Sequence, residues 1–196
     1  GDVPSKTGLQ YTNRATGLTP NTAPYQFDKV HLVPFGEFIP PGFRWFVEAF
    51  RVPMSDFARG SSEQAPFSIA RQGQSDVNAA ITICYEDIFG GELASRIGNS
   101  EKPVHLLINM TNLAWFGKSQ ASSQQLRLSQ LRSLETGLPA LRATNTGITS
   151  VLGPDGKVLS SLPEFTQANL SAQVQAHVGK TPYVLWGNFP DRKSVV

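Results

Sequence analysis

The feature that most constrains the fold is an apolar, β-branched run at residues 79–83, which ends at Cys84, the only cysteine of the chain. Such a run predicts a buried strand, and the stretch from Glu86 onward is compatible with a helix. We therefore expect Cys84 at a strand-to-helix junction, where backbone N–H groups and a helix N-terminus stabilise a thiolate or an oxyanion. The alternative is a buried cysteine that serves only as a small apolar side chain.

The neighbouring segments predict an alternation of strands and helices. Apolar patterning predicts strands at 25–35 and 104–110, a helix at 119–137 and a β-hairpin within 143–162 that turns at Gly153-Pro-Asp-Gly156. Four leucines are expected on one face of this helix: Leu128, Leu131, Leu134 and Leu138. This order of elements indicates a layered α/β or α+β domain.

Three other segments complete the expected organisation. Residues 1–24 predict an irregular connection with short strands, and residues 55–78 predict a long polar loop. Residues 41–52 carry apolar side chains at helical spacing, which predicts an amphipathic helix. Core packing is the ordinary explanation of that stripe. The alternative is a lid on a membrane interface, with Trp45 at the level of the lipid headgroups.

Composition excludes several classes of function. The chain has 196 residues and a net charge of +2, and its basic residues are scattered, so we expect no nucleic-acid partner. One cysteine excludes an internal disulfide framework and a cysteine-based zinc site. His31 and His105 have no second ligand at metal spacing and are expected to be structural. The longest apolar runs are shorter than the roughly 18 residues of a membrane span.

Two residues of opposite charge, Lys29 and Glu37, lie near the ends of the apolar segment around residue 30. A lysine in such a segment requires a partner, and Glu37 after the Gly36 turn is the candidate. One interpretation is a solvated lysine and a loop glutamate. The other is that Lys29 places a positive charge beside Cys84, which lowers the thiol pKa and stabilises an oxyanion. Glu86 is expected either to orient neighbouring groups or to complement the helix dipole.

Four motifs occur in a fixed order along the chain. They are His31-Leu-Val-Pro-Phe-Gly-Glu37 preceded by Lys29, Ile83-Cys-Tyr-Glu86, Trp115-Phe-Gly117 and Leu141-Arg-Ala-Thr-Asn-Thr-Gly147. Together they resemble the nitrilase, or carbon–nitrogen hydrolase, superfamily, and within it the bacterial apolipoprotein N-acyltransferases. The long insert between Pro40 and Ala79 favours the acyltransferase branch over the soluble amidases.

The resemblance implies a fold and a set of site residues. The fold is a four-layer α-β-β-α sandwich, of which residues 1–190 are an N-terminally incomplete part with 1–24 as its lead-in. Cys84 is the implied nucleophile, Lys29 the lysine of a Glu-Lys-Cys triad and Glu37 an additional essential glutamate. Tyr85 and Glu86 are the implied supporting residues beside the nucleophile. Trp115 and Phe116 either line an acyl pocket or pack in the core, and Leu113 stands where many relatives carry an acidic residue.

The implied reaction moves an acyl chain from a phospholipid, through a Cys84 thioester, to the N-terminal amine of a diacylglyceryl-cysteine lipoprotein, with no metal or organic cofactor. Its implied place is the periplasmic side of the bacterial inner membrane, reached through transmembrane helices outside this chain. Residues 191–196 stand where the last of these helices would follow. Two alternatives stay open. One is a soluble amidase or nitrilase that uses water as acceptor, and the other is an inactive fragment, because the upstream triad glutamate of the family is absent from this chain.

Overall fold

The computed structural model describes residues 2–5, 8–20, 22–34, 36–38 and 57–188. The predicted helix at 41–52, with Trp45, and the tail at 191–196 lie outside these ranges. The chain divides into two compact units, the first formed by residues 1–18 and 22–62 and the second by residues 19–21 and 63–196. Each unit is described by itself.

The first unit contains two antiparallel strand pairs. Strand β1 (Asp2–Ser5) pairs with β2 (Gly8–Tyr11), and β3 (Arg14–Gly17) pairs with β4 (Tyr25–Asp28). The lead-in therefore contains short strands, as expected. The strand predicted at 25–35 is too long, because β4 ends at Asp28 and the next residue bonds to loops. The Lys29 N–H donates to the Asn13 carbonyl, and the Lys29 carbonyl accepts from the Gly60 N–H, each at 2.8 Å.

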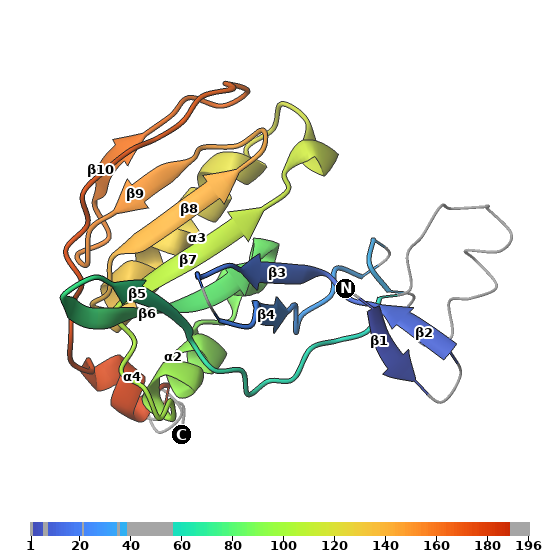
Figure 1. Cartoon of the computed structure of the whole chain (residues 1–196). Helices are drawn as coiled ribbons and strands as arrows, with labels where there is room; N and C mark the ends of the chain where they lie inside the picture. The colour runs from blue at the N-terminus through green and yellow to red at the C-terminus, as the bar shows by residue number, and fades with distance from the viewer. Residues whose placement is uncertain (1, 6–7, 21, 35, 39–56, 189–196) are drawn as a thin grey trace, which may run out of the picture. The chain divides into compact units, whose positions relative to one another are not determined.

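The second unit is built on a six-stranded mixed sheet of order β10-β9-β8-β7-β6-β5 (Figure 1). Its strands are β5 (Phe67–Arg71), β6 (Gln74–Ile83), β7 (Leu106–Thr111), β8 (Ala140–Thr144), β9 (Ser150–Leu152) and β10 (Val158–Ser161). Strands β6, β7 and β8 are parallel, and the outer strands pair antiparallel. The hairpin predicted within 143–162 is confirmed as β9–β10.

The prediction of a loop at 55–78 is wrong over its second half. Residues from Phe67 onward form β5 and the start of β6, which turn at Gly73 with φ of +71°. The turn end of this hairpin, residues 71–76, is polar and exposed, and the apolar Phe67 and Ile69 of β5 are only half-buried, so the apolar alternation is too short to predict a strand. The backbone hydrogen bonds between β5 and β6 supply the stabilisation that the side-chain pattern does not reveal.

The helices of the second unit pack against its sheet and form an apolar core with it. They are α2 (Gly90–Gly98), α3 (Ala121–Thr136) and α4 (Pro182–Trp186), with short 3-10 turns η1 (Cys84–Ile88) and η2 (Ala114–Phe116). Alternate residues of the strands share one face of the sheet and meet these helices. The core cluster consists of Ala80, Leu93, Ala94, Ile97, Val104, Leu107, Leu138, Ala140, Leu152 and Val184. The expected α/β class is confirmed.

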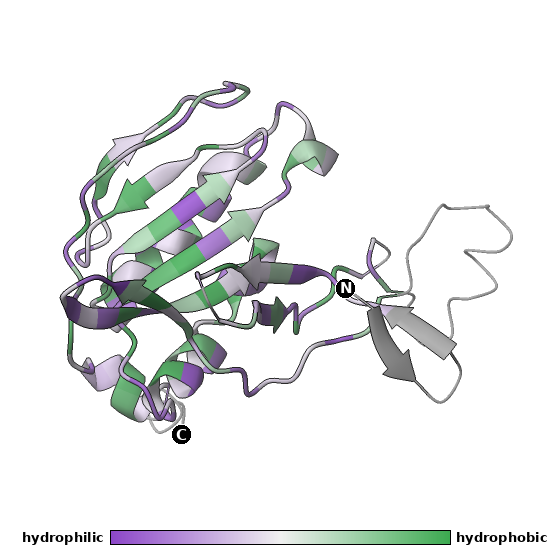
Figure 2. Ribbon diagram, in the orientation of Figure 1, coloured by the Kyte–Doolittle hydropathy of each residue, from purple (hydrophilic) through white to green (hydrophobic). Residues whose placement is uncertain are grey.

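Helix α3 does not bury the leucine face that its sequence predicts. Leu131 and Leu134 are 43% and 59% exposed and Leu128 is half-buried, whereas Leu138 is buried in the core but lies beyond the end of the helix. The buried positions are instead mostly polar: Ser122, Gln125, Ser129, Arg132, Ser133 and Thr136. This burial of polar side chains is explained by the strands against which α3 lies. In Figure 1 the helix runs behind β7 and β8, and each of these strands carries a hydrophilic segment in the middle of the sheet (Figure 2). Buried polar groups require hydrogen-bond partners, and the polar face of α3 supplies them.

Candidate active site

Cys84 lies where β6 ends and η1 begins, and its backbone has a φ of +58°. The preceding Ile83 is still extended, with φ of −118° and ψ of 121°. The left-handed region costs a non-glycine residue about 1–2 kcal/mol, so the surrounding contacts must hold it there. The result is a sharp change of direction that places a half-buried thiol, which forms no disulfide, at the carboxyl end of a central strand. The predicted strand-to-helix junction is confirmed.

Side chains of the turn fix its backbone. The buried Glu86 accepts a hydrogen bond from the Ile83 N–H at 2.7 Å through Oε2, so its carboxylate ties the last strand residue to the turn. The ring of Tyr85 lies edge-on to that of Phe89, with centroids 5.7 Å apart. Asn109, on the neighbouring strand β7, donates from Nδ2 to the Cys84 carbonyl at 3.1 Å. The nucleophile candidate is thus held from its own turn and from the next strand.

Asp87 belongs to the same turn, and its residue is 3% exposed. Its carboxylate accepts hydrogen bonds from Thr82 at 2.9 Å and Ser129 at 2.5 Å, and Arg142 lies 3.9 Å away. Burial raises the pKa of Asp87, and the bonds from Ser129 and Thr82 oppose that effect. Burial lowers the pKa of Arg142, and the negative charge of Asp87 opposes this shift. Arg142 is thus the buried ion-pair partner of Asp87.

The predicted pairing of Lys29 with Glu37 is confirmed within the first unit. Lys29 is 1% exposed, and its Nζ donates to both carboxylate oxygens of Glu37, at 2.9 and 2.7 Å. The same carboxylate accepts from Asn13 Nδ2 and from the Val33 N–H, each at 2.8 Å. The interpretation of a solvated lysine is wrong, since a lysine buried this deeply is stable only with such a partner.

The predicted site residues therefore fall into two sets. Lys29 and Glu37 belong to the first unit, whereas Cys84, Tyr85 and Glu86 belong to the second. Within each unit the structure brings the expected residues together. That Lys29 stands beside Cys84 stays a prediction.

Trp115 and Phe116 form most of η2, which follows β7. Because β6 and β7 are parallel, η2 emerges at the edge of the sheet at which β6 ends at Cys84. The two aromatic side chains are 80% and 54% exposed, so packing in the core is excluded. Asn112 accepts from the Ala114 N–H at 3.0 Å, which is the turn role that its position allows. The acyl-pocket role of the aromatic pair stays a prediction.

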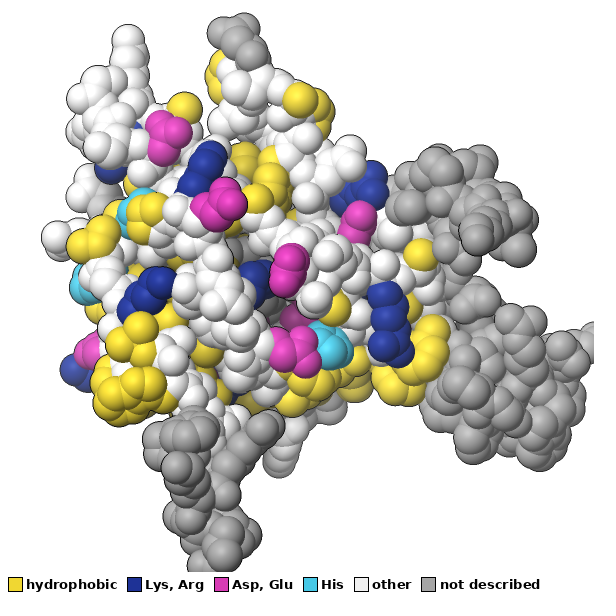
Figure 3. All heavy atoms as spheres, turned by 90° about the horizontal axis from the view of Figure 1, so that it is seen from below, with side chains coloured by type: hydrophobic (Ala, Val, Ile, Leu, Met, Phe, Trp, Pro, Cys, Tyr) yellow, Lys and Arg dark blue, Asp and Glu magenta, His cyan; other side chains and the backbone are white. Residues whose placement is uncertain are grey.

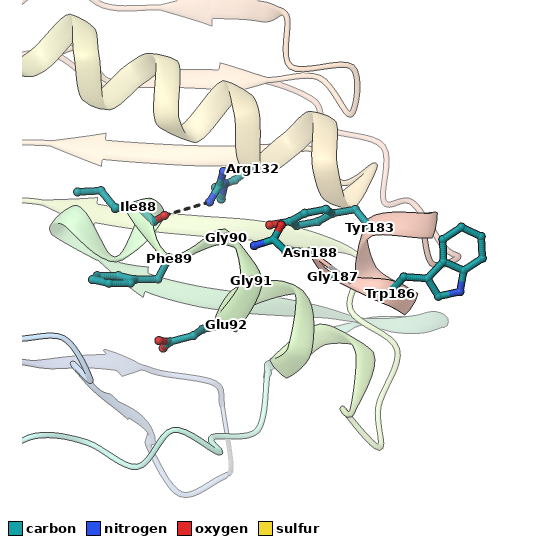
Figure 4. Close-up of a pocket in the computed structure, with 10 residues that line it drawn as sticks. All are labelled: Ile88, Phe89, Gly90, Gly91, Glu92, Arg132, Tyr183, Trp186, Gly187 and Asn188. Carbon is teal, nitrogen blue, oxygen red and sulfur yellow. Dashed lines mark hydrogen bonds between the residues drawn. The ribbon is translucent and has the colours of Figure 1, made fainter. Parts of the chain in front are cut away.

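A pocket of about 740 Å³ lies beyond the end of η1 (Figure 4). Helices α2, α3 and α4 contribute to its lining, which consists of Ile88, Phe89, Gly90, Gly91, Glu92, Arg132, Tyr183, Trp186, Gly187 and Asn188. Arg132 donates to the Ile88 carbonyl at 3.4 Å and to Glu135 at 2.9 Å. Cys84, Trp115 and Phe116 do not line this pocket, so it is not the acyl pocket that the sequence predicts.

Metal ligation and charge give no further site. Among the described residues, no group of three or more His, Cys, Asp or Glu side chains could hold a metal ion. His105 accepts the Asn78 N–H at 2.9 Å through Nδ1, which is a structural role. On the face shown in Figure 3, basic and acidic side chains are interspersed. No helix in the described part of the chain is long and apolar enough to cross a membrane.

Reasoning from the sequence missed the polar residues beneath the turn, above all Asp87 and Asn109. A signal for each was present. Asp87 is a second acidic residue directly after Glu86, and Asn109 is a polar residue inside an otherwise apolar strand. A polar residue in a buried strand needs a partner, but the sequence does not name that partner.

Comparison with known proteins identifies relatives of this chain. An apolipoprotein N-acyltransferase of Ralstonia nicotianae is 48% identical over 97% of this chain and 36% of its own length. One of Chromobacterium violaceum is 45% identical over 96% of this chain and 35% of its own. The chain thus spans about a third of the curated relatives that it matches.

A crystal structure of an amidase from Nesterenkonia sp. is similar with a TM-score of 0.49 and 18% identity, over 89% of this chain and 56% of that one. The family model described as carbon-nitrogen hydrolase matches residues 4–183, which confirms the expected nitrilase-like fold class. With a match that covers nearly its whole length, the chain belongs to the carbon–nitrogen hydrolase family.

Proposed function

We propose that this chain is the Cys84-bearing part of an apolipoprotein N-acyltransferase. The observation that carries the proposal is the geometry of Cys84, whose left-handed backbone places a half-buried thiol at the end of a central strand. The names of the relatives support the same reaction class. We expect the whole enzyme to work at the periplasmic face of the bacterial inner membrane, where phospholipid and lipoprotein meet.

The first half-reaction acylates the enzyme. The Cys84 thiolate attacks an ester carbonyl of a phospholipid, a C–S bond forms, and the ester C–O bond breaks. The departing lysophospholipid oxygen takes up a proton, and the acyl chain remains as a thioester. Lys29, fixed by Glu37, supplies the positive charge that stabilises the oxyanion of the tetrahedral intermediate.

The second half-reaction releases the acyl chain. The free α-amine of a diacylglyceryl-cysteine at a lipoprotein N-terminus attacks the thioester, a C–N bond forms, and the C–S bond breaks. The amine loses a proton, and Cys84 returns as thiolate. A thiolate is both a good nucleophile and a good leaving group, so it suits both steps. Trp115 and Phe116, exposed at the same edge of the sheet, are the proposed contacts of the acyl chain.

Intact-protein mass spectrometry of the full-length protein tests the proposal. After incubation with phosphatidylethanolamine in detergent, we expect a mass increase of one acyl chain that hydroxylamine removes and that Cys84→Ala lacks. Addition of a diacylglyceryl-cysteine peptide should discharge the adduct and yield the triacylated peptide. An adduct discharged only by water would favour an amidase-type hydrolase. No adduct on the wild-type protein would overturn the acyltransferase proposal.

A further inference from the structure

A closed ring of hydrogen-bonded side chains lies directly beneath the Cys84 turn. Its members come from η1, β7, α3 and β8: Asp87, Asn109, Thr111, Gln125, Ser129 and Arg142. All six are buried, with exposures between 2% and 7%. A polar network closed in this way and shielded from water is stronger and more rigid than its separate bonds.

The direction of every bond in the ring is set by its two charged members. Arg142 can only donate, and the carboxylate of Asp87 accepts. The short branch runs from Arg142 through Ser129 to Asp87, with bonds of 2.8 and 2.5 Å. Since the guanidinium fixes the donor end and the carboxylate the acceptor end, the Ser129 hydroxyl between them has one orientation.

The long branch runs in the same direction and ends at Asn109. Arg142 donates to Gln125 at 3.0 Å, Gln125 donates to Thr111 at 3.2 Å, and Thr111 donates to the Oδ1 of Asn109 at 2.5 Å. The Nδ2 of Asn109 then donates to Asp87 at 3.1 Å and, outside the ring, to the Thr82 hydroxyl at 2.9 Å. The amide of Asn109 is thus fixed with its oxygen toward Thr111 and its N–H groups toward the turn.

The ring holds the turn at two points, the carbonyl of the strained residue itself and a side chain three residues later. Asn109 Nδ2 also donates to the carbonyl of Cys84 at 3.1 Å, and Asp87 belongs to the same turn three residues later. A left-handed cysteine is stable only where its surroundings over-determine the backbone. We propose that Asn109, held by the ring between Arg142 and Asp87, is a positioning residue that keeps Cys84 in its left-handed conformation and aims its thiol. The proposal rests on the proposed nucleophilic role of Cys84.

A double-mutant cycle tests this without any substrate. In the wild-type background, Cys84→Gly should raise the Tm of the full-length protein, because glycine adopts a positive φ without strain. In an Asn109→Ala background the turn is free to relax, so we expect at most about half of that gain to remain. Equal gains in Tm in both backgrounds would overturn the proposal. The effects of Cys84→Gly and Asn109→Ala on stability would then be additive, as expected if Asn109 does not hold the backbone of Cys84.

The burst of acylation of Cys84 by p-nitrophenyl acetate gives the second readout. We expect Asn109→Ala to slow the burst about 100-fold in folded protein, as loss of orientation does, with little change in KM. Two buried hydroxyls outside the ring provide controls. The Ser150 hydroxyl has no hydrogen-bond partner among the described residues, and the Thr136 hydroxyl donates to the Arg132 carbonyl. Ser150→Ala and Thr136→Val should each change the burst less than about threefold. An Asn109→Ala burst as fast as that of the controls would overturn the proposal.

A replacement variant and a comparison with the phospholipid assay complete the test. If Asn109→Ala does not fold, Thr111→Val replaces it, because this near-isosteric change removes the bond that orients the Asn109 amide, together with the bond that Thr111 accepts from Gln125. A non-additive cycle with a slowed ester burst, in a protein that forms no phospholipid adduct, would support the positioning role and overturn the acyltransferase function. Phospholipid transfer together with an additive cycle would support the acyltransferase function and overturn the positioning role of Asn109.

Discussion

The Nζ of Lys29 donates to both carboxylate oxygens of Glu37 in a site where the lysine side chain is 1% exposed. Breaking a buried pair by removing one partner leaves an uncompensated charge. We therefore expect Glu37→Gln to destabilise the protein by about 3 kcal/mol or more and to abolish acyl transfer. Chemical denaturation measures the first effect, and the phospholipid adduct assay measures the second.

The double variant Lys29→Met with Glu37→Gln is the matched control for that pair. It removes both charges, so we expect it to recover much of the stability lost in Glu37→Gln while staying inactive. A Glu37→Gln protein with wild-type stability would contradict the structure of the pair. An active double variant would exclude Lys29 from the mechanism.

The strain at Cys84 gives a second prediction. Cys84→Ala should abolish acyl transfer with little loss of stability, because alanine at φ of +58° carries nearly the same backbone strain as cysteine. Cys84→Ser should be severely impaired, because a hydroxyl is the weaker nucleophile. Cys84→Gly should also be inactive but more stable by about 1 kcal/mol. Unfolding curves of the three variants, compared with their adduct formation, check these outcomes. Acyl transfer by Cys84→Ala would contradict the mechanism.

Local patterns predicted the parts of the fold that local physics decides. The helix that we expected to end at Gly137 does so, with φ of +67° at that glycine, and the turn at 153–156 closes with the Gly156 N–H on the Gly153 carbonyl at 2.9 Å. Cys84 and the Lys29–Glu37 pair were also found, since an apolar run ending in a thiol and a lysine near a carboxylate are visible along the chain.

The remainder of the site depends on contacts between distant segments. Ser129 meets Asp87 across 42 residues of sequence, and Gln125 meets Arg142 across 17. No periodicity of α3 reveals that its polar face is the buried one, because the reason lies in the buried polar residues of the neighbouring strands. Leucine spacing alone therefore selected the wrong face of that helix.

The pocket of Figure 4 yields a third prediction, centred on Gly90. A methyl group at this position would overlap the guanidinium of Arg132, which bonds the Ile88 carbonyl at the end of the Cys84 turn. We expect Gly90→Ala to cost about 1–3 kcal/mol of stability through that forced displacement. The next residue is the control. Among the described residues, a Cβ at Gly91 meets only Asn188 Nδ2, at 3.7 Å, so Gly91→Ala should be neutral or stabilising by up to about 1 kcal/mol. Thermal unfolding separates the two, and equal effects would contradict the packing at Gly90.

The last prediction concerns acid stability and the strand pair β3–β4. Arg14 donates to both carboxylate oxygens of Asp28, at 2.6 and 2.7 Å, and Thr12 donates to the same group at 2.7 Å. The Arg14 bonds lower the pKa of Asp28 below its ordinary value of 3.8, although burial opposes them. A carboxyl whose pKa is lowered by folding releases its proton more readily in the folded state. It therefore contributes stability above pH 3.8 and loses that contribution as the pH falls through its folded-state pKa.

Asp28→Asn should remove this contribution while keeping the size of the side chain. At pH 7 we expect the variant to be less stable than wild type by up to about 1 kcal/mol, the scale of a partly exposed pair. The difference should shrink as the pH falls, because the wild-type carboxylate becomes protonated and its ion pair with Arg14 is lost. Tm measured in parallel for both proteins from neutral pH down to about pH 2 checks the sign. A difference that stays constant across this range would mean that Asp28 stabilises the strand pair through neutral hydrogen bonds rather than through its charge.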